Sequence, residues 1–62
     1  MDRPPCRLIG TDGNVFAIIG RVSACLREHD RRDLACEWAS RAMACRSYNE
    51  VLALMSIYVD PY

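Results

Sequence analysis

The spacing of the apolar residues after position 14 constrains the fold of this 62-residue chain more than any other feature. Apolar side chains that recur every three or four residues form one stripe along a helix. The first stripe runs through Val15, Ile18, Ile19, Val22, Cys25 and Leu26. A strand needs no such pattern over a segment of this length. The spacing therefore predicts a helix over 15–29, in preference to a strand that would form a hairpin after Asp12-Gly13.

A second stripe predicts a helix over 32–45. Its members are Leu34, Ala35, Trp38, Ala39, Ala42, Met43 and Cys45. We expect Asp30 to cap the start of this helix. We expect Trp38, the largest apolar side chain of the protein, to anchor the core or an interface.

A third stripe predicts a helix over 48–58. Ser47 and Glu50 have the Ser-x-x-Glu spacing of a capping box, in which the serine oxygen accepts from the third amide and the glutamate reaches back. The stripe consists of Val51, Leu52, Leu54, Met55, Tyr58 and Val59. Because residues 57–59 are also good strand formers, an alternative stays open in which this end straightens and pairs with residues 6–9.

The first helix is entered through the turn Gly10-Thr11-Asp12-Gly13-Asn14. Gly13 supplies the positive φ that a tight turn needs, and Asp12 or Asn14 can cap the helix. The backbone amides of such a helix start can bind an anion. The turn lacks a phosphate-loop pattern, however, and Asp12 would repel a phosphate. A structural turn is therefore favoured.

These elements predict a mainly α fold: a single domain over 1–62, with three helices, a short N-terminal extended segment and a glycine turn. Residues 1–5 are expected to be a flexible lead-in. Gly20 lies inside the first helix, where glycine costs about 1 kcal/mol relative to alanine, so we expect another element to cross closely there. A chain this short buries only about 60% of its surface on folding. Since 52% of its residues are hydrophobic, part of the apolar surface is expected to meet a protein partner or a second copy.

The charges argue against a general polyanion binder. The chain has eight basic residues, all arginine, and eight acidic residues, so its formal net charge is zero. Non-specific nucleic-acid affinity depends on excess positive charge. Five arginines could gather near the second helix, but acidic residues are interleaved with them: Arg27, Arg31, Arg32, Arg41 and Arg46. Nucleic-acid binding remains an alternative that is not favoured.

The four cysteines are interpreted as free and mostly buried thiols. Neither a secretory leader nor a stretch of about 20 apolar residues is found, so we expect a cytoplasmic protein without a membrane segment. Thiols stay reduced in that compartment. Cys25 and His29, with Cys36 and Cys45, could supply a zinc site, but the spacing lacks a Cys-x-x-Cys knuckle. No metal or cofactor is therefore expected, and with one histidine in a charged connection we expect no enzyme.

The turn belongs to a longer pattern that resembles a family of small uncharacterised stand-alone proteins of bacteria and of their phages and plasmids. The pattern reads Leu8-Ile9-Gly10-x-Asp12-Gly13-Asn14-x-Phe16-x-Ile18-x-Gly20-Arg21-Val22. The C-terminal Ser47-Tyr48-Asn49-Glu50-Val51-Leu52 and Tyr58-Val59-Asp60 are similar to that family's Asp-Tyr-Asp-x-Leu-Leu and Tyr-Val segments. Ser47 and Arg46 stand where the family has aspartate and glycine, and the cysteines are not part of its pattern. The resemblance implies a small accessory protein of the kind that mobile elements encode, with no activity attached.

We therefore expect a small non-enzymatic accessory protein that binds another macromolecule. A phage or mobile-element inhibitor of a host machine, of the anti-CRISPR kind, is one form of this function. The alternatives are a nucleic-acid-binding helical protein and a regulatory homo-oligomer. The candidate binding residues are Gly10, Asp12, Gly13, Asn14, Tyr48, Arg27, Arg31 and Arg32.

Overall fold

Helices make up most of the chain in the computed structural model, which describes residues 3–8 and 13–62. The elements follow the order β1 (Pro5–Cys6), α1 (Val15–Glu28), α2 (Arg32–Met43), α3 (Tyr48–Tyr58) and β2 (Asp60–Pro61). The prediction of a mainly α three-helix domain with a short N-terminal extended segment is confirmed. The first helix ends one residue, and the second two residues, before the expected boundary.

The α1 helix begins and ends through local hydrogen bonds. The Asn14 side chain accepts a hydrogen bond from the Phe16 amide at 2.8 Å, so Asn14 is the N-cap. At the other end, the Arg31 amide donates to the Leu26 carbonyl and the Asp30 amide donates to the Arg27 carbonyl. This is the pattern of a Schellman motif, in which the residue after the C-cap takes a left-handed conformation. Asp30 fills that position with φ of 60°.

The prediction that Asp30 caps the start of α2 was wrong. The N-cap of α2 is Arg31, and its side chain makes no capping hydrogen bond. Asp30 cannot cap α2 because the tight connection places it at the end of α1, in the left-handed region that aspartate tolerates better than most residues. Asp30 therefore ends α1, although the sequence pattern predicted that it would cap the start of α2.

The capping box at the start of α3 is present in a modified form. The Ser47 hydroxyl accepts from the Glu50 amide at 3.2 Å, as predicted. The Glu50 carboxylate reaches back one residue further than the usual pattern and accepts from the Arg46 amide at 2.8 Å. These two hydrogen bonds satisfy donors at the helix start and fix the direction in which the α2–α3 connection enters α3.

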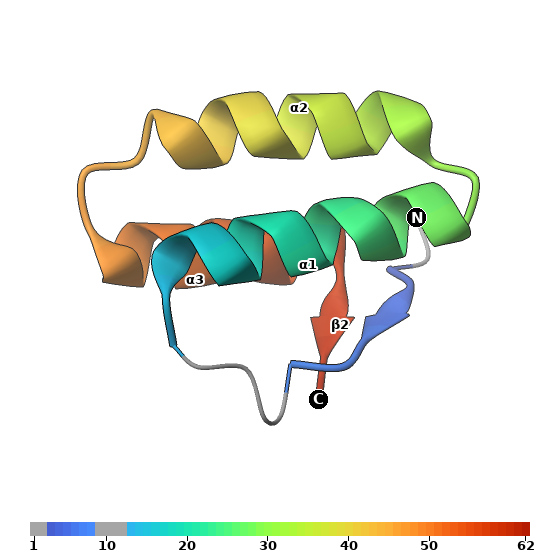
Figure 1. Cartoon of the computed structure of the whole chain (residues 1–62), viewed down its shortest axis with the longest axis horizontal. Helices are drawn as coiled ribbons and strands as arrows, with labels where there is room; N and C mark the ends of the chain where they lie inside the picture. Colours follow the sequence, from blue (N-terminus) through green and yellow to red (C-terminus); the bar gives the residue numbers. More distant parts are fainter. Residues whose placement is uncertain (1–2, 9–12) are drawn as a thin grey trace.

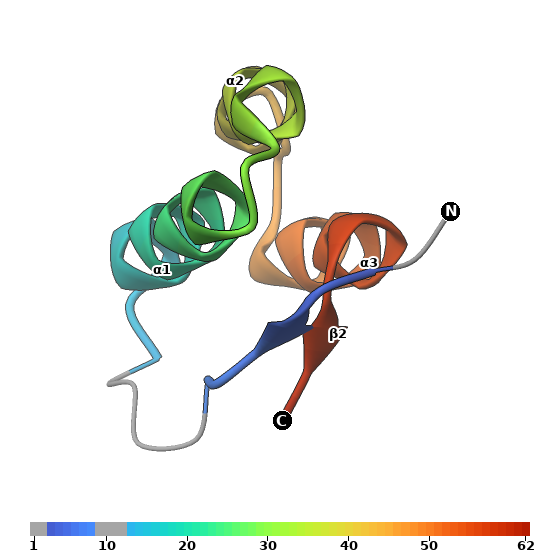
Figure 2. The same ribbon diagram turned by 90° about the vertical axis from the view of Figure 1, so that its right-hand side faces the viewer.

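The three helices form a triangular bundle, with the two short strands on one side of it. Figure 1 shows α2 above α1, with α3 behind α1 and the strands below. In Figure 2 the helices stand at the corners of a triangle, and the strands lie on the side away from α2. The chain therefore places α1 and α2 as an antiparallel pair, which brings the start of α1 and the end of α2 to the same end of the molecule.

The strands β1 and β2 pair in parallel and join the two ends of the described chain. Pro5 is opposite Asp60 and Cys6 is opposite Pro61. The Asp60 and Tyr62 amides donate to carbonyls of Pro4 and Cys6, so Pro61 lies at a position where its missing N–H is not needed. The pairing expected as an alternative thus occurs directly after residues 57–59, once α3 has ended, and its partner is Pro5–Cys6. Pro5 belongs to β1, so the lead-in is shorter than expected.

Trp38 is the centre of the core. Its side chain is completely buried on α2, and its indole Nε1 donates to the Ile19 carbonyl of α1 at 3.0 Å. Its ring meets that of Tyr58 on α3 edge to face, with centroids 5.8 Å apart. One side chain therefore contacts both other helices. Most of the expected stripe residues are buried around it, but Met43 is exposed, so its assignment to the buried stripe was wrong.

The close approach expected at Gly20 is absent among the described residues. A Cβ atom built on Gly20 would meet no atom of another element within 4 Å. Gly20 therefore carries the helix cost of glycine without a packing benefit. We expect Gly20→Ala to raise the free energy of unfolding by about 0.5–1 kcal/mol, measured by urea denaturation.

The matched control is Ala24→Gly, which makes the opposite change at another exposed position of α1. This variant is expected to lose a similar amount of stability. A destabilised Gly20→Ala variant would show that another part of the chain does approach Gly20.

Candidate functional site

The site best formed to bind another molecule is an apolar groove where the ends of the three helices meet. Its volume is about 430 Å³. It opens where α1 begins, α2 ends and α3 begins, and the α2–α3 connection forms one side. The lining residues, called here the helix-end groove, are Val15, Phe16, Ile19, Ala42, Met43, Cys45, Arg46, Ser47, Tyr48 and Val51.

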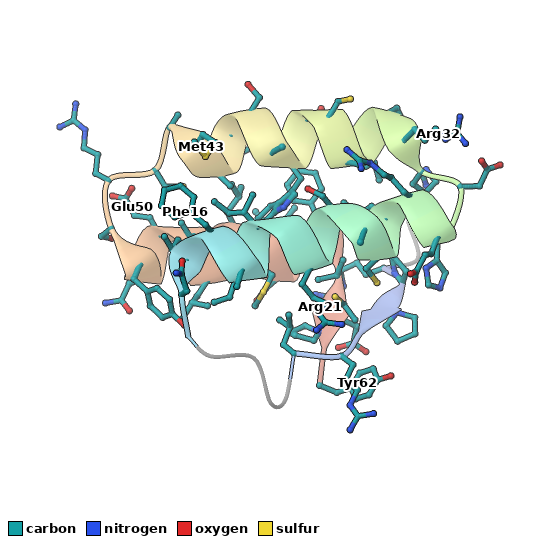
Figure 3. The ribbon with its side chains drawn as sticks, viewed as in Figure 1. Phe16, Arg21, Arg32, Met43, Glu50 and Tyr62 are labelled. Carbon is teal, nitrogen blue, oxygen red and sulfur yellow. The ribbon has the colours of Figure 1, made fainter. Side chains whose placement is uncertain are left out.

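Large apolar side chains stand exposed around this groove. Phe16 is 65% exposed, Met43 63% and Tyr48 43%. In Figure 3, Phe16 and Met43 lie at the same end of the bundle, where α1 starts and α2 finishes. Ile57 and Tyr62, the other exposed large apolar residues of the described chain, lie outside the groove. Three of the five exposed large apolar residues of the described chain thus line this groove.

The base of the groove is formed by residues that belong to the core or pack against it. Ala42 and Val51 are buried, at 3% and 2% exposure, and Val15 and Ile19 pack against the core cluster. The exposed side chains therefore stand on three fixed helix ends. A partner would meet a surface that is already formed, and little ordering of the backbone would oppose binding.

Arg46 is the one charged residue among those that line the groove in the described part of the chain. Its side chain is exposed and makes no ion pair with another described residue. Its backbone amide is held by the Glu50 carboxylate, which belongs to the start of α3 and not to the groove lining. The groove therefore combines an apolar surface with a single cation.

The predicted binding residues do not form one site. Gly10 and Asp12 lie outside the described residues. Gly13 has the expected positive φ of 74° and Asn14 caps α1, so both have structural roles. Tyr48 lines the helix-end groove together with Val15 and Phe16 of α1.

The three predicted arginines lie at the opposite end of the bundle. Arg27 is in the last turn of α1, Arg31 is the N-cap of α2, and Arg32 is its first residue. Figure 3 shows Arg32 at the end of the molecule away from Phe16 and Met43. Arg31 pairs with Asp33 at 3.5 Å. The backbone amide of Leu34, followed by Arg31, lowers the pKa of Asp33. These arginines therefore belong to a surface with mixed charges.

Sequence reasoning missed Phe16 and Met43 as binding residues, and it grouped Arg46 with the other arginines near the second helix and not with this groove. Phe16 offered a signal, because it is a large apolar residue that lies off the stripe of α1. Met43 offered none, since its spacing fits the stripe of α2. Whether a residue at the last turn of a helix is covered depends on where the next helix starts, and the sequence does not give this.

A second, more polar pocket lies beside β1 and the C-terminal half of α1. Its volume is about 320 Å³, and its lining includes Cys6, Cys25 and His29. The Cys25 thiol donates to the Pro5 carbonyl at 3.1 Å, and His29 Nδ1 lies 2.9 Å from the Cys25 carbonyl oxygen. Burial, followed by the neighbouring Cys25 thiol, raises the pKa of Cys6 to about 12. A thiol that stays protonated is a poor nucleophile and a poor metal ligand.

The cysteines do not assemble into a metal site. Cys6 and Cys25 are buried, Cys45 is partly buried, and Cys36 is exposed. The expectation that the thiols are mostly buried was therefore wrong for Cys36. Within residues 3–8 and 13–62, no three His, Cys, Asp or Glu side chains converge as metal ligands. His29 bonds to the backbone of Cys25 and not to its thiol.

A polar cluster joins α2 to α3 near the core. The Tyr58 hydroxyl donates to the Glu37 carboxylate and accepts from Arg41 at 2.8 Å. The Arg41 guanidinium also lies 5.7 Å from the centre of the Tyr58 ring. Burial, followed by the hydrogen bond to Glu37, raises the pKa of Tyr58. Because these partners satisfy one another, the cluster fixes α3 against α2.

Comparison with protein-family models, with curated proteins and with solved structures gave no match to this chain. The family resemblance of the turn therefore stays a prediction. In the described ranges, no helix is both long enough and apolar enough to span a bilayer. What the helix-end groove can bind has to follow from its own shape and chemistry.

The raised pKa of Cys6 predicts how stability depends on pH. The pKa of an ordinary cysteine is 9.0, and burial raises the pKa of Cys6 in the folded chain to about 12. The unfolded chain therefore loses this proton first, and the stabilisation that Cys6 provides is complete below pH 9 and is lost as the pH rises towards 12. We expect the free energy of unfolding to fall by up to about 1.4 kcal/mol per pH unit above pH 9.

The measurement is urea unfolding between pH 7 and 10.5 with a reducing agent present. The pKa of Tyr58 is also raised in the folded chain, so its deprotonation likewise lowers the free energy of unfolding as the pH rises. Cys6→Ala is therefore expected to reduce the slope of the free energy of unfolding against pH and not to remove it. An equal slope in the wild-type chain and in Cys6→Ala would contradict the assignment to Cys6.

Proposed function

We propose that this protein is a small non-enzymatic accessory protein that acts by binding another protein through the helix-end groove. The observation that carries the proposal is the concentration of exposed Phe16, Met43 and Tyr48 around one preformed apolar hollow. A contiguous apolar surface of this kind marks interaction sites on small proteins, whereas isolated exposed apolar residues do not.

The residue types support a protein partner. Phenylalanine, tyrosine and methionine are enriched at protein–protein interfaces, since they contribute large contact areas. Methionine also adapts to the shape of an incoming apolar side chain. The buried Ala42 and Val51 leave space between the exposed side chains. A partner that inserts an apolar side chain there would be surrounded by Phe16, Met43 and Tyr48.

The alternative of nucleic-acid binding has less support. Arg27, Arg31 and Arg32 lie at one end of the bundle, but Asp33 pairs with Arg31 there. The net charge of the chain is zero, so counterion release would contribute little to affinity. A phage-type inhibitor of a host machine would be one case of the proposed function, and only the family resemblance points to that case.

The proposal predicts that groove variants lose a partner while remaining folded. The test is affinity purification of the tagged chain from cells that naturally carry it, with mass spectrometry of the bound proteins. We expect one protein to co-purify stoichiometrically with the wild type. The double variant Phe16→Ser, Met43→Ser should lose about 2 kcal/mol or more of binding free energy, roughly thirty-fold in affinity.

The matched control is Ile57→Ser. Ile57 is 57% exposed, similar to Phe16 and Met43, but lies outside the groove. Recovery of the partner should be unchanged in this variant. The proposal fails if the groove variant keeps every partner of the wild type, or if Ile57→Ser loses the same proteins.

A further inference from the structure

We infer that the helix-end groove recognises a protein segment in which a large apolar side chain stands next to a carboxylate, Asp or Glu, that pairs with Arg46. This inference rests on the proposed function, and it adds the chemistry of the partner. The apolar part of the segment fills the space between Phe16, Met43 and Tyr48. The carboxylate meets the guanidinium at the rim.

The positive charge of Arg46 favours a partner that carries a negative charge at this place. Arg46 is the one charged residue of the lining, and no described acidic side chain pairs with it. The Glu50 carboxylate accepts a hydrogen bond from the Arg46 backbone amide and forms no ion pair with the Arg46 side chain. An arginine at the edge of an apolar surface pairs well with a carboxylate, because the guanidinium offers two parallel donors. A partner with lysine or arginine at this place would be repelled.

The start of α3 adds donors beside the same edge. The first intrahelical hydrogen bond of α3 runs from the Val51 amide to the Ser47 carbonyl. The Tyr48 and Asn49 amides precede it, and no acceptor for them is found among the described residues. A carboxylate drawn in by Arg46 would therefore find backbone donors near Tyr48, which itself lines the groove.

A second copy of the chain fits the groove less well. In a symmetric dimer the same surface patch occurs on both sides of the interface. Two copies of the groove would bring two Arg46 side chains into one interface, and the described lining contains no acidic residue to pair with either. Like charges in an apolar interface oppose association. The inferred occupant is therefore a different, acidic and apolar segment.

The test uses a phage-displayed library of random twelve-residue peptides, selected on the full-length immobilised protein. Enriched peptides are then synthesised with a fluorescent label, and their affinities are measured by fluorescence anisotropy. The protein variants are Arg46→Gln, Met43→Ser and Arg32→Gln. The last is the matched control, since Arg32 is an exposed arginine at the far end of the bundle. Circular dichroism checks that each variant is folded.

We expect enriched peptides to carry a large apolar residue within a few positions of Asp or Glu. Arg46→Gln should weaken them by roughly three- to ten-fold, and Arg32→Gln should leave them unchanged. Replacing the acidic residue of the peptide by its amide should weaken binding to the wild type by a similar factor. Against Arg46→Gln, the same replacement in the peptide should weaken binding little further. This result would assign the pairing to the peptide carboxylate and the Arg46 guanidinium.

Two results would overturn the inference and leave the proposed function standing. The first is a set of peptides that lose binding in Met43→Ser but contain no acidic residue, or that bind Arg46→Gln as tightly as the wild type. The second is a concentration-dependent dimer in analytical ultracentrifugation that Met43→Ser abolishes, since a second copy would then occupy the groove. If all enriched peptides instead bind Met43→Ser as tightly as the wild type, the helix-end groove is not the binding site. The proposed function would then fail together with the inference.

Discussion

The burial of Trp38 holds the three helices together, and the other features of the structure depend on it. The indole lies on α2, bonds to the Ile19 carbonyl of α1 and packs edge to face on Tyr58 of α3. Tyr58 extends the link through Glu37 and Arg41 on α2. The relative positions of the helix ends, and hence the helix-end groove, follow from this central contact.

The helix-end groove forms because the ends of the three helices meet at one end of a small bundle. Three helices that pack around one indole cover its ring, but at the end of the bundle no further element of the described chain covers Phe16 and Met43. A larger domain would place another helix or loop there. Here the side chains stay exposed on a base of core residues, and Arg46 is the one charged residue of the described lining. Under the proposed function, a partner protein covers the apolar side chains that the described residues leave exposed.

Several local features of the fold were predictable from the sequence, because neighbouring residues decide them. Asn14 caps α1, and Ser47 with Glu50 caps α3, through contacts within a few positions of the chain. Asp30 was assigned wrongly, since aspartate suits both an N-cap and a left-handed turn, and the tight connection decides between them. The role of Gly20 was also wrong, because a sequence cannot show whether another element passes nearby.

The sequence by itself determined the three helices and the caps at the start of α1 and α3, because helical periodicity and side-chain capping are short-range effects. Only the tertiary structure decided the parallel pairing of β1 with β2 and the exposure of Met43. Residues far apart in the chain set both features. The same holds for the helix-end groove, in which Phe16, Met43 and Tyr48 come from three different helices. Their meeting depends on the packing around Trp38, and no local pattern in the sequence encodes it.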